Sequence, residues 1–145
     1  MRLIEKKGDL FKITNADAYA HCISGDYALG AGIAKQFDQR YNMRSALKKE
    51  YPIPFSWDYA NVGKALYVNG VYNLVTKPRY WMKPTYSVFE KALVDMKKDC
   101  VNRGIQTIAM PKIGCGLDRL NWDIVRDLIK EVFADTEITI IVAEL

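Results

Sequence analysis

The chain has 145 residues and a formal net charge of +4, and half of its residues are hydrophobic. This length and balance predict one globular domain over residues 1–145, large enough to bury a core. No apolar run approaches the ~20 residues that a membrane-spanning helix needs, so we expect no membrane partner. Charged residues follow too soon after the N-terminus for a signal peptide, so we expect a cytoplasmic protein, or a nuclear one if the source is eukaryotic.

The first part of the chain alternates short strands with two helices. A short strand opens at Leu3-Ile4, and a small apolar strand covers residues 18–23. Residues 33–41 and 43–51 have the spacing of helices. Residues 52–59 are rich in proline and aromatic side chains, so we expect a surface excursion there instead of regular helix.

The second part of the chain has stronger signals. Asn69-Gly70 predicts a hairpin turn between strands at 64–69 and 71–76. A long amphipathic helix follows over about 85–103, and then come a strand at 105–110, a helix at 122–134 and a last strand at 137–145. This alternation predicts an α/β fold in which helices cover a central mixed sheet.

Histidine and cysteine are too few for a metal centre or a disulfide framework. The chain has one histidine, His21, and three cysteines without Cys-x-x-Cys spacing, Cys22, Cys100 and Cys115. His21 lies in a predicted buried strand, where a core role is favoured over that of a base. Cys22 and Cys115 are weaker candidates for nucleophiles, because no histidine lies near Cys115 in the sequence. We therefore expect neither a metal nor a cofactor.

Two glycine loops are the most informative feature of the sequence. Gly30-Ala-Gly32 and Gly114-Cys-Gly116 each follow a predicted buried strand and lead toward a predicted helix. Backbone N–H groups in such loops bind phosphate, and ligands of open α/β sheets lie at the carboxyl ends of the strands. Neither loop has the Walker or the dinucleotide pattern, and each alone is also consistent with a plain turn. As a pair they predict a nucleoside-diphosphate ligand held between two helix N-termini.

Six stretches of sequence follow the order of one family pattern over nearly the whole chain. They are Gly8-Asp9-Leu10-Phe11, Ala20-His21-Cys22-Ile23-Ser24, residues 29–34 (LGAGIA), Thr76-Lys77, Lys83-Pro84-Thr85-Tyr86 and residues 110–122 (MPKIGCGLDRLNW). These stretches resemble macro domains, and most of all the terminal ADP-ribose protein glycohydrolase branch. Two departures are that residues 52–63 do not match the family's loop, and that residues 21–24 replace an asparagine-rich stretch of many other macro domains.

The resemblance implies a three-layer α/β/α fold that binds ADP-ribose. The ligand-binding residues that it implies are Asp9, Leu10, Ser24, Gly30, Ala31, Gly32, Ile33, Thr76, Pro111, Ile113, Gly114, Cys115, Gly116 and Leu117. By this resemblance, Asp9 accepts a hydrogen bond from adenine and Ser24 lies near the distal ribose. Residues 30–33 and 113–117 hold the diphosphate from opposite sides, and Lys77 and Asp118 are the catalytic pair.

The chemistry of these two residues suits removal of ADP-ribose from a carboxylate. Lys77 can attack the opened sugar aldehyde or the anomeric carbon as an amine, which gives an intermediate of the Schiff-base (imine) type, and Asp118 can move protons and activate water. A lysine reacts only as the neutral amine, which burial and the nearby Arg79 and Lys83 favour and an adjacent carboxylate opposes. By residue type alone, Lys77 would be an exposed lysine at a strand end, and Asp118 an acid beside Arg119 or a helix N-terminus.

We therefore expect a monomeric ADP-ribosyl hydrolase acting on acidic side chains and on O-acyl-ADP-ribose esters such as O-acetyl-ADP-ribose. The residues leave open an ADP-ribose 1″-phosphate phosphatase, a non-catalytic ADP-ribose-binding module, and a hydrolase of ADP-ribose attached to a nucleic-acid base, which the positive charge would suit. The expected partner is ADP-ribose or an ADP-ribosylated protein or base. Trp57, Tyr59, Tyr80 and Trp81 are candidates for stacking on a base or a target protein, or for covering the core.

Overall fold

The computed structural model describes residues 1–54, 57 and 59–145. Residues 55, 56 and 58 of the predicted surface excursion lie outside the described residues. The elements in chain order are β1 (Arg2–Lys7), a short 3₁₀ helix η1 (Leu10–Lys12), β2 (Ala18–Ser24), α1 (Gly32–Tyr41), α2 (Met43–Glu50), β3 (Ala65–Val68), β4 (Val71–Lys77), α3 (Tyr86–Arg103), β5 (Thr107–Met110), α4 (Trp122–Phe133) and β6 (Thr139–Glu144).

The strands form one six-stranded mixed sheet, as the sequence predicted. Its order is β1-β6-β5-β2-β4-β3, and every neighbouring pair is parallel except the β3–β4 hairpin. The predicted hairpin turn is confirmed, because Asn69 and Gly70 both have positive φ, at 51° and 79°. Because β2, β4 and β5 are parallel, their carboxyl ends meet at the same edge of the sheet, and the loops that follow them lie together there.

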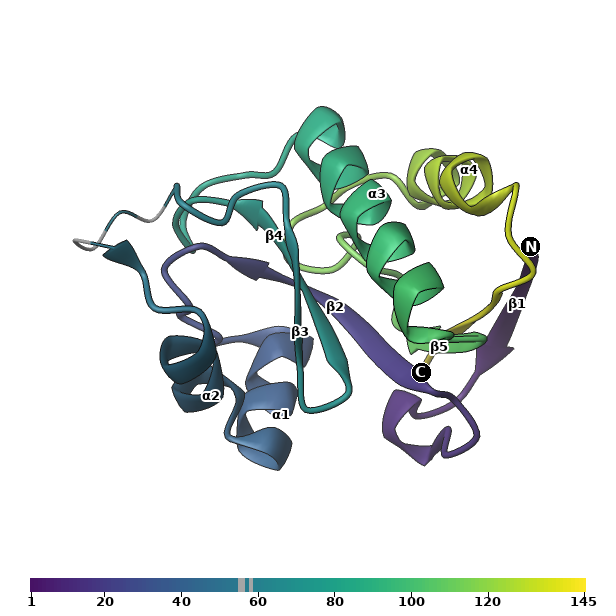
Figure 1. Cartoon of the computed structure of the whole chain (residues 1–145), viewed down its shortest axis with the longest axis horizontal. Helices are drawn as coiled ribbons and strands as arrows, with labels where there is room; N and C mark the ends of the chain where they lie inside the picture. The colour runs from purple at the N-terminus through teal and green to yellow at the C-terminus, as the bar shows by residue number, and fades with distance from the viewer. Residues whose placement is uncertain (55–56, 58) are drawn as a thin grey trace.

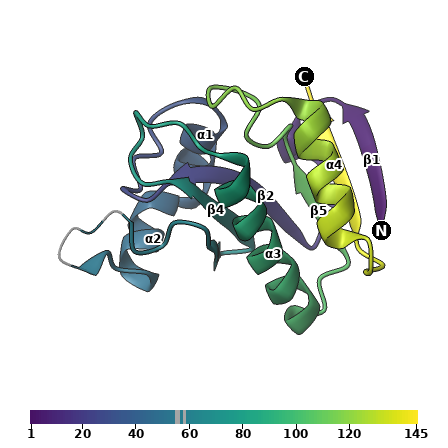
Figure 2. The ribbon, with the colours of Figure 1, turned by 90° about the horizontal axis from the view of Figure 1, so that it is seen from above.

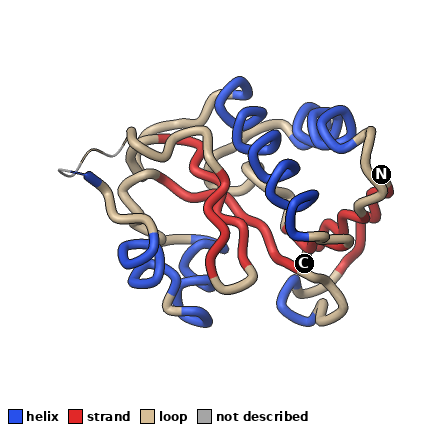
Figure 3. The backbone as a smooth tube through the Cα atoms, viewed as in Figure 1, coloured by secondary structure: helices blue, strands red, loops and turns tan. Residues whose placement is uncertain are grey.

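Helices cover both faces of the sheet, which confirms the three-layer α/β/α arrangement (Figures 1, 2 and 3). Helices α3 and α4 lie on one face, and α1 and α2 lie on the other (Figure 2). Phe89 and Leu93 of α3 and Ile129 of α4 are buried in one core cluster, whereas Phe37 of α1 and Met43 of α2 are buried in a second one. The sheet therefore has a separate core on each face.

The caps of the helices follow their sequences. Helix α3 starts after Thr85, whose hydroxyl accepts a hydrogen bond from the Val88 amide at 3.2 Å, and it ends at Gly104 with φ 72°. Helix α4 starts after Asn121, whose side chain accepts from the Asp123 amide at 2.8 Å. Across the described part of the chain, no helix has the length and apolar character that crossing a bilayer requires.

Candidate functional site

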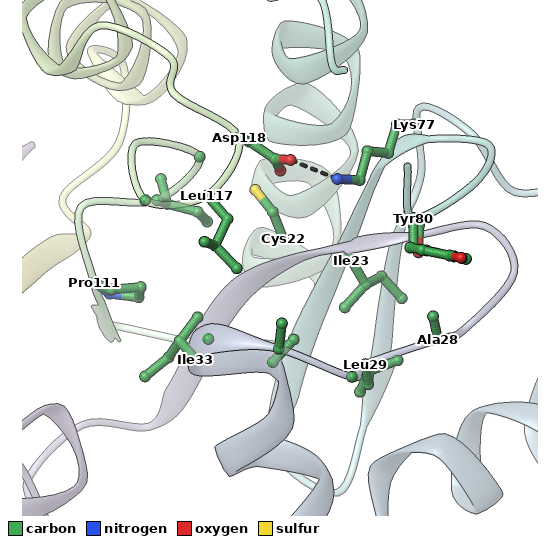
Figure 4. Close-up of a pocket in the computed structure, with 18 of the residues that line it drawn as sticks. Cys22, Ile23, Ala28, Leu29, Ile33, Lys77, Tyr80, Pro111, Leu117 and Asp118 are labelled. Atoms are coloured by element: carbon green, nitrogen blue, oxygen red, sulfur yellow. Dashed lines mark hydrogen bonds and ion pairs between the residues drawn. The ribbon is translucent and has the colours of Figure 1, made fainter. Parts of the chain in front are cut away.

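A cavity of about 770 Å³ lies at the carboxyl ends of β2, β4 and β5 (Figure 4). The loops that follow these three strands form its walls. A second cavity of about 380 Å³, lined by Asp9 and Leu10 among others, adjoins it. Ile33, Pro111 and Lys112 line both cavities, so the two together form one elongated site.

The first wall is the N-terminus of α1. Its cap residue is Ala31, which makes no side-chain cap hydrogen bond, so the first amides of the helix are not satisfied by a cap. Gly32 has φ 59°, and a Cβ there would lie 3.3 Å from Leu117 Cδ1 of the opposite wall. Free amides at a helix N-terminus and a close approach of the two walls are the features that a bound diphosphate requires.

The second wall is the loop between β5 and α4, and it differs from the prediction. Gly114 has φ 74°, and the Leu120 amide donates to the Gly114 carbonyl at 2.9 Å, so the loop folds back on itself. Helix α4 begins at Trp122, as the sequence predicted, but neither Asn121 nor Trp122 lines either cavity. The prediction of two helix N-termini is therefore wrong for this loop, because these turns separate the glycines from the helix.

Lys77 and Asp118 meet on the wall of the large cavity. Lys77 Nζ lies 2.5 Å from Asp118 Oδ1 (Figure 4), and the side chains are only 13% and 14% exposed. Lys77 ends β4, and Asp118 stands in the loop after β5. Lys83 Nζ donates to the Leu117 carbonyl at 3.2 Å and ties the loop after β4 to the same segment. The arrangement places an amine and a carboxylate within proton-transfer distance.

The two cysteines near this pair are poor nucleophiles. Burial, followed by the charge of Asp118, raises the pKa of the Cys22 thiol far above its ordinary value. Burial also raises the pKa of Cys115 to about 11, and its Sγ lies 3.4 Å from the Ile113 carbonyl, to which the thiol donates. Only the thiolate attacks efficiently, so neither cysteine is favoured as the nucleophile of the site.

His21 is a core residue, as its neighbours in the sequence predicted. Its ring is buried, stacks on Phe37 at a centroid distance of 4.1 Å, and places Nε2 2.5 Å from Asn73 Oδ1. The Asn73 amide nitrogen donates to backbone carbonyls, so Asn73 Oδ1 accepts and His21 Nε2 donates. Burial lowers the pKa of His21 to about 4, which keeps the ring neutral.

Asp26, which sequence reasoning missed, joins two walls of the cavity. Its Oδ1 accepts from the Ser24 hydroxyl at 2.5 Å and from the Ala28 amide at 3.1 Å, and its Oδ2 accepts from the Tyr80 amide at 2.9 Å. The carboxylate thus links the loop after β2 to the loop after β4. Because the Ser24 hydroxyl already donates to Asp26, its oxygen is left to accept a hydrogen bond from a ligand.

The structure places most residues of the expected ligand set along the elongated site. The large cavity is lined by Ser24, Gly30, Ala31, Gly32, Ile33, Pro111, Ile113, Gly114, Gly116 and Leu117, and the second cavity by Asp9, Leu10 and Cys115. Thr76 lines neither, because it is buried within β4 at 2% exposure. Its expected role as a ligand-binding residue does not agree with this position.

Further lining residues of the large cavity were not part of the expected ligand set, although Tyr80 was a candidate for stacking. They are Cys22, Ile23, Ala28, Leu29, Ala34, Tyr80, Lys83 and Lys112. Each lies within six residues of an expected site residue, so extending the motifs along the chain would have included them. Over the described residues, no three histidine, cysteine, aspartate or glutamate side chains group as a metal site.

Comparison with known proteins agrees with this architecture. The family model described as Macro domain matches residues 21–129. A human protein named ADP-ribose glycohydrolase OARD1 is 41% identical, with 99% of this chain and 92% of that protein covered, and its bovine counterpart is 40% identical with the same coverage.

Solved structures share the fold at lower sequence identity. The macrodomain of Mycobacterium tuberculosis DarG superposes with a TM-score of 0.83 at 20% identity, covering 99% of this chain and 97% of that one. Thermosipho africanus DarTG in complex with ADP-ribose gives a TM-score of 0.78 at 20% identity, covering 99% of this chain and 42% of that one. From the match of the family model and the full-length relatives, we conclude that this chain belongs to the Macro domain family.

Proposed function

We propose that this protein is an ADP-ribose hydrolase that releases ADP-ribose from acidic side chains of proteins and from O-acyl-ADP-ribose esters. The observation that carries the proposal is the Lys77–Asp118 pair, with Nζ 2.5 Å from Oδ1, on the wall of a cavity between two glycine loops. The full-length relatives named ADP-ribose glycohydrolase, at 40% and 41% identity, support the same activity.

The elongated site offers a place for each part of ADP-ribose. The adenine end occupies the second cavity beside Asp9, and the diphosphate lies between the free amides of α1 and the loop at Gly114. The distal ribose then reaches the Lys77–Asp118 pair, with the Ser24 oxygen available to accept from a sugar hydroxyl. Binding in this order brings the anomeric carbon to the amine.

The reaction follows from the proton positions at the pair. Asp118 takes a proton from the Lys77 ammonium, and the neutral amine attacks the anomeric carbon. A C–N bond forms while the C–O bond to the acyl group breaks, and the electron pair leaves with the carboxylate. The leaving carboxylate carries off the proton held by Asp118. The Asp118 carboxylate then takes a proton from water, the water oxygen adds to the same carbon as the C–N bond breaks, and this proton returns to the Lys77 amine as ADP-ribose is released.

Turnover of three substrates tests this proposal. The protein is incubated with an ADP-ribosyl-glutamyl peptide, O-acetyl-ADP-ribose or ADP-ribose 1″-phosphate, and released ADP-ribose and inorganic phosphate are measured. We expect ADP-ribose from the two esters. Phosphate release from the third substrate without cleavage of the esters would identify a phosphatase instead, and ADP-ribose binding without any turnover would identify a binding module.

A matched pair of variants connects the activity to the site. Lys77→Met removes the amine of the cavity, whereas Lys97→Met removes the lysine of a surface pair in which Lys97 Nζ lies 2.6 Å from Asp135 Oδ1. We expect Lys77→Met to lose turnover and Lys97→Met to keep it. Equal activity of the two variants would reject the lysine as the nucleophile.

A further inference from the structure

Tyr80 lies at the end of the large cavity that is farther from the second cavity, where the adenine is proposed to bind. Figure 4 places Tyr80 and Ala28 across the cavity from Pro111 and Ile33, and the latter two also line the second cavity beside Asp9. A ligand that starts in the second cavity and reaches Lys77 therefore points its far end toward Tyr80. In a substrate, the group attached to the sugar continues from that end.

Two large aromatic side chains are exposed in succession at this point. Tyr80 is 66% exposed and Trp81 is 61% exposed, although residues of this size usually bury most of their surface. Leu117, also largely exposed, lines the same cavity. Adjacent aromatic surface beside a cavity is typical of a contact site for another molecule.

Hydrogen bonds hold the backbone under these side chains on both sides of the cavity. The Tyr80 amide donates to Asp26 Oδ2 at 2.9 Å, which ties it to the loop after β2. Lys83 Nζ donates to the Leu117 carbonyl at 3.2 Å, which ties the same segment to the loop after β5. The aromatic pair is thus presented by a segment fixed at both ends, so little ordering is required when a partner binds.

The proposed function sets the partner at this end, because the leaving group is an acidic side chain of a protein. Of the lysines here, Lys77 is paired with Asp118, and Lys83 donates to the Leu117 carbonyl. Aromatic side chains make large contacts with apolar side chains and peptide groups. They also stack on nucleic-acid bases, so an oligonucleotide is the alternative partner in the test.

We infer that Tyr80 and Trp81 form a leaving-group subsite that contacts the polypeptide carrying the ADP-ribose. This inference rests on the proposed hydrolase function. The ADP-ribose part fills the elongated site, the modified acidic side chain extends past Lys77, and the residues around it lie on the two aromatic rings. The subsite therefore sets the preference for modified protein over small acyl esters, which share the ADP-ribose but lack the chain beyond it.

The test compares kcat/KM on an ADP-ribosyl-glutamyl peptide with kcat/KM on O-acetyl-ADP-ribose. We expect Tyr80→Ala and Trp81→Ala each to lower the ratio of the two values about tenfold, the loss typical of a well-packed aromatic contact. Tyr80→Phe keeps the ring and should retain the ratio. Trp57→Ala is the matched control, because Trp57 is 60% exposed but lies outside the segment that carries Lys77, Tyr80 and Lys83 to the cavity. Trp81 also lines neither cavity, but it belongs to that segment and follows Tyr80 directly.

The outcomes separate the subsite from the hydrolase function. If the wild-type protein cleaves both substrates, and Tyr80→Ala and Trp81→Ala keep the ratio of the two kcat/KM values, the subsite is rejected and the hydrolase function is retained. The same comparison is made with an ADP-ribosylated single-stranded oligonucleotide in place of the peptide. If Tyr80→Ala and Trp81→Ala lower kcat/KM for the oligonucleotide relative to O-acetyl-ADP-ribose but keep the ratio for the peptide, the surface binds nucleic acid and the polypeptide assignment is overturned. If the unmodified protein cleaves neither ester, the hydrolase function fails, and the inference fails with it.

Discussion

Lys77 Nζ lies 2.5 Å from Asp118 Oδ1, although the two residues are 41 positions apart in the sequence. Strand order explains this contact. β4 and β5 both pair with β2 in parallel, so the end of β4 and the loop after β5 meet at the same edge of the sheet. Cys22 of β2, which lies between these strands, lines the same cavity. The fold thus brings an amine and a carboxylate together on the wall of a cavity, where both side chains are largely buried.

Replacing Asp118 by asparagine should separate catalysis from binding. Asp118→Asn keeps the size of the side chain and a hydrogen-bond acceptor for Lys77, but it cannot take the proton. We expect kcat on O-acetyl-ADP-ribose to fall at least about a hundredfold, in the range that general acid–base groups contribute. Calorimetry should show little change in ADP-ribose affinity. Asp135→Asn, in the surface pair with Lys97, is the control that should keep kcat. An unchanged kcat in Asp118→Asn would exclude the carboxylate as the base.

The glycine at position 114 should be required for the stability of its loop. Gly114 has φ 74°, and a Cβ there would lie 2.9 Å from Leu120 Cδ1. We expect Gly114→Ala to lower the free energy of unfolding by about 2 kcal/mol, because an L-residue in the left-handed region is strained. Gly116→Ala is the matched control, since a Cβ at Gly116 meets nothing within 4 Å. Equal urea midpoints for the two variants would contradict this role of the loop geometry.

The carboxylate of Glu144, which forms an ion pair at the proposed adenine end of the site, should weaken the binding of an anionic ligand. Lys112 Nζ lies 2.5 Å from Glu144 Oε2, and both residues line the second cavity. The Glu144 carboxylate neutralises Lys112, which also lines the large cavity where the diphosphate is proposed to lie. We expect Glu144→Gln to bind ADP-ribose about threefold more tightly at low salt, an effect that added salt reduces. Lys112→Met should weaken binding under the same conditions. Weaker binding by Glu144→Gln in calorimetry would show that the carboxylate contributes to recognition.

Buried His21 should make the protein less stable in mild acid. Burial lowers the pKa of His21 to about 4, below the ordinary value of 6.5, so the unfolded chain binds the proton more tightly. The stability that the neutral ring contributes is complete above pH 6.5 and is lost as pH falls toward 4. From pH 7 to about pH 5, we expect a loss of about 2 kcal/mol in the free energy of unfolding.

A neutral replacement isolates this histidine from other titrating groups. His21→Gln keeps a side chain that can donate to Asn73 and has no proton to gain in this range. Urea unfolding at both pH values should give a smaller loss for the variant than for the unmodified protein. The same loss in both proteins would assign the acid sensitivity to other residues.

Local patterns in the sequence predicted the helices and strands and the first wall of the site, at the N-terminus of α1. The apolar spacing and the Asn69-Gly70 turn located the strands and helices, because periodicity and turn chemistry act over few residues. The loop at Gly32 leads directly into α1, as expected. The helix after Gly114 also starts at residue 122, as predicted, but its N-terminus does not line the cavity, since the path of the loop depends on turns that close only in three dimensions.

Other features depended on contacts that the sequence does not encode locally. Thr76 was expected beside the ligand but is buried, and a register shift between Ile23 and Ser24 in the β2–β4 pairing alters the alignment next to it. Asp26 went unnoticed because its partner Tyr80 is 54 positions away. The closeness of Lys77 and Asp118 followed only from the family resemblance, since strand order cannot be read from periodicity.

Mass spectrometry of the intact protein and of its peptides tests the central claim most directly. The wild-type protein and the Asp118→Ala and Lys77→Ala variants are incubated with ADP-ribose or O-acetyl-ADP-ribose. A reductant then traps the imine between lysine and sugar, and the protein is digested. Because Asp118 is proposed to activate the water that releases the sugar, we expect one ADP-ribose adduct, located on Lys77, to accumulate in Asp118→Ala. Full turnover by Lys77→Ala, or an adduct at another residue in Asp118→Ala, would contradict the account.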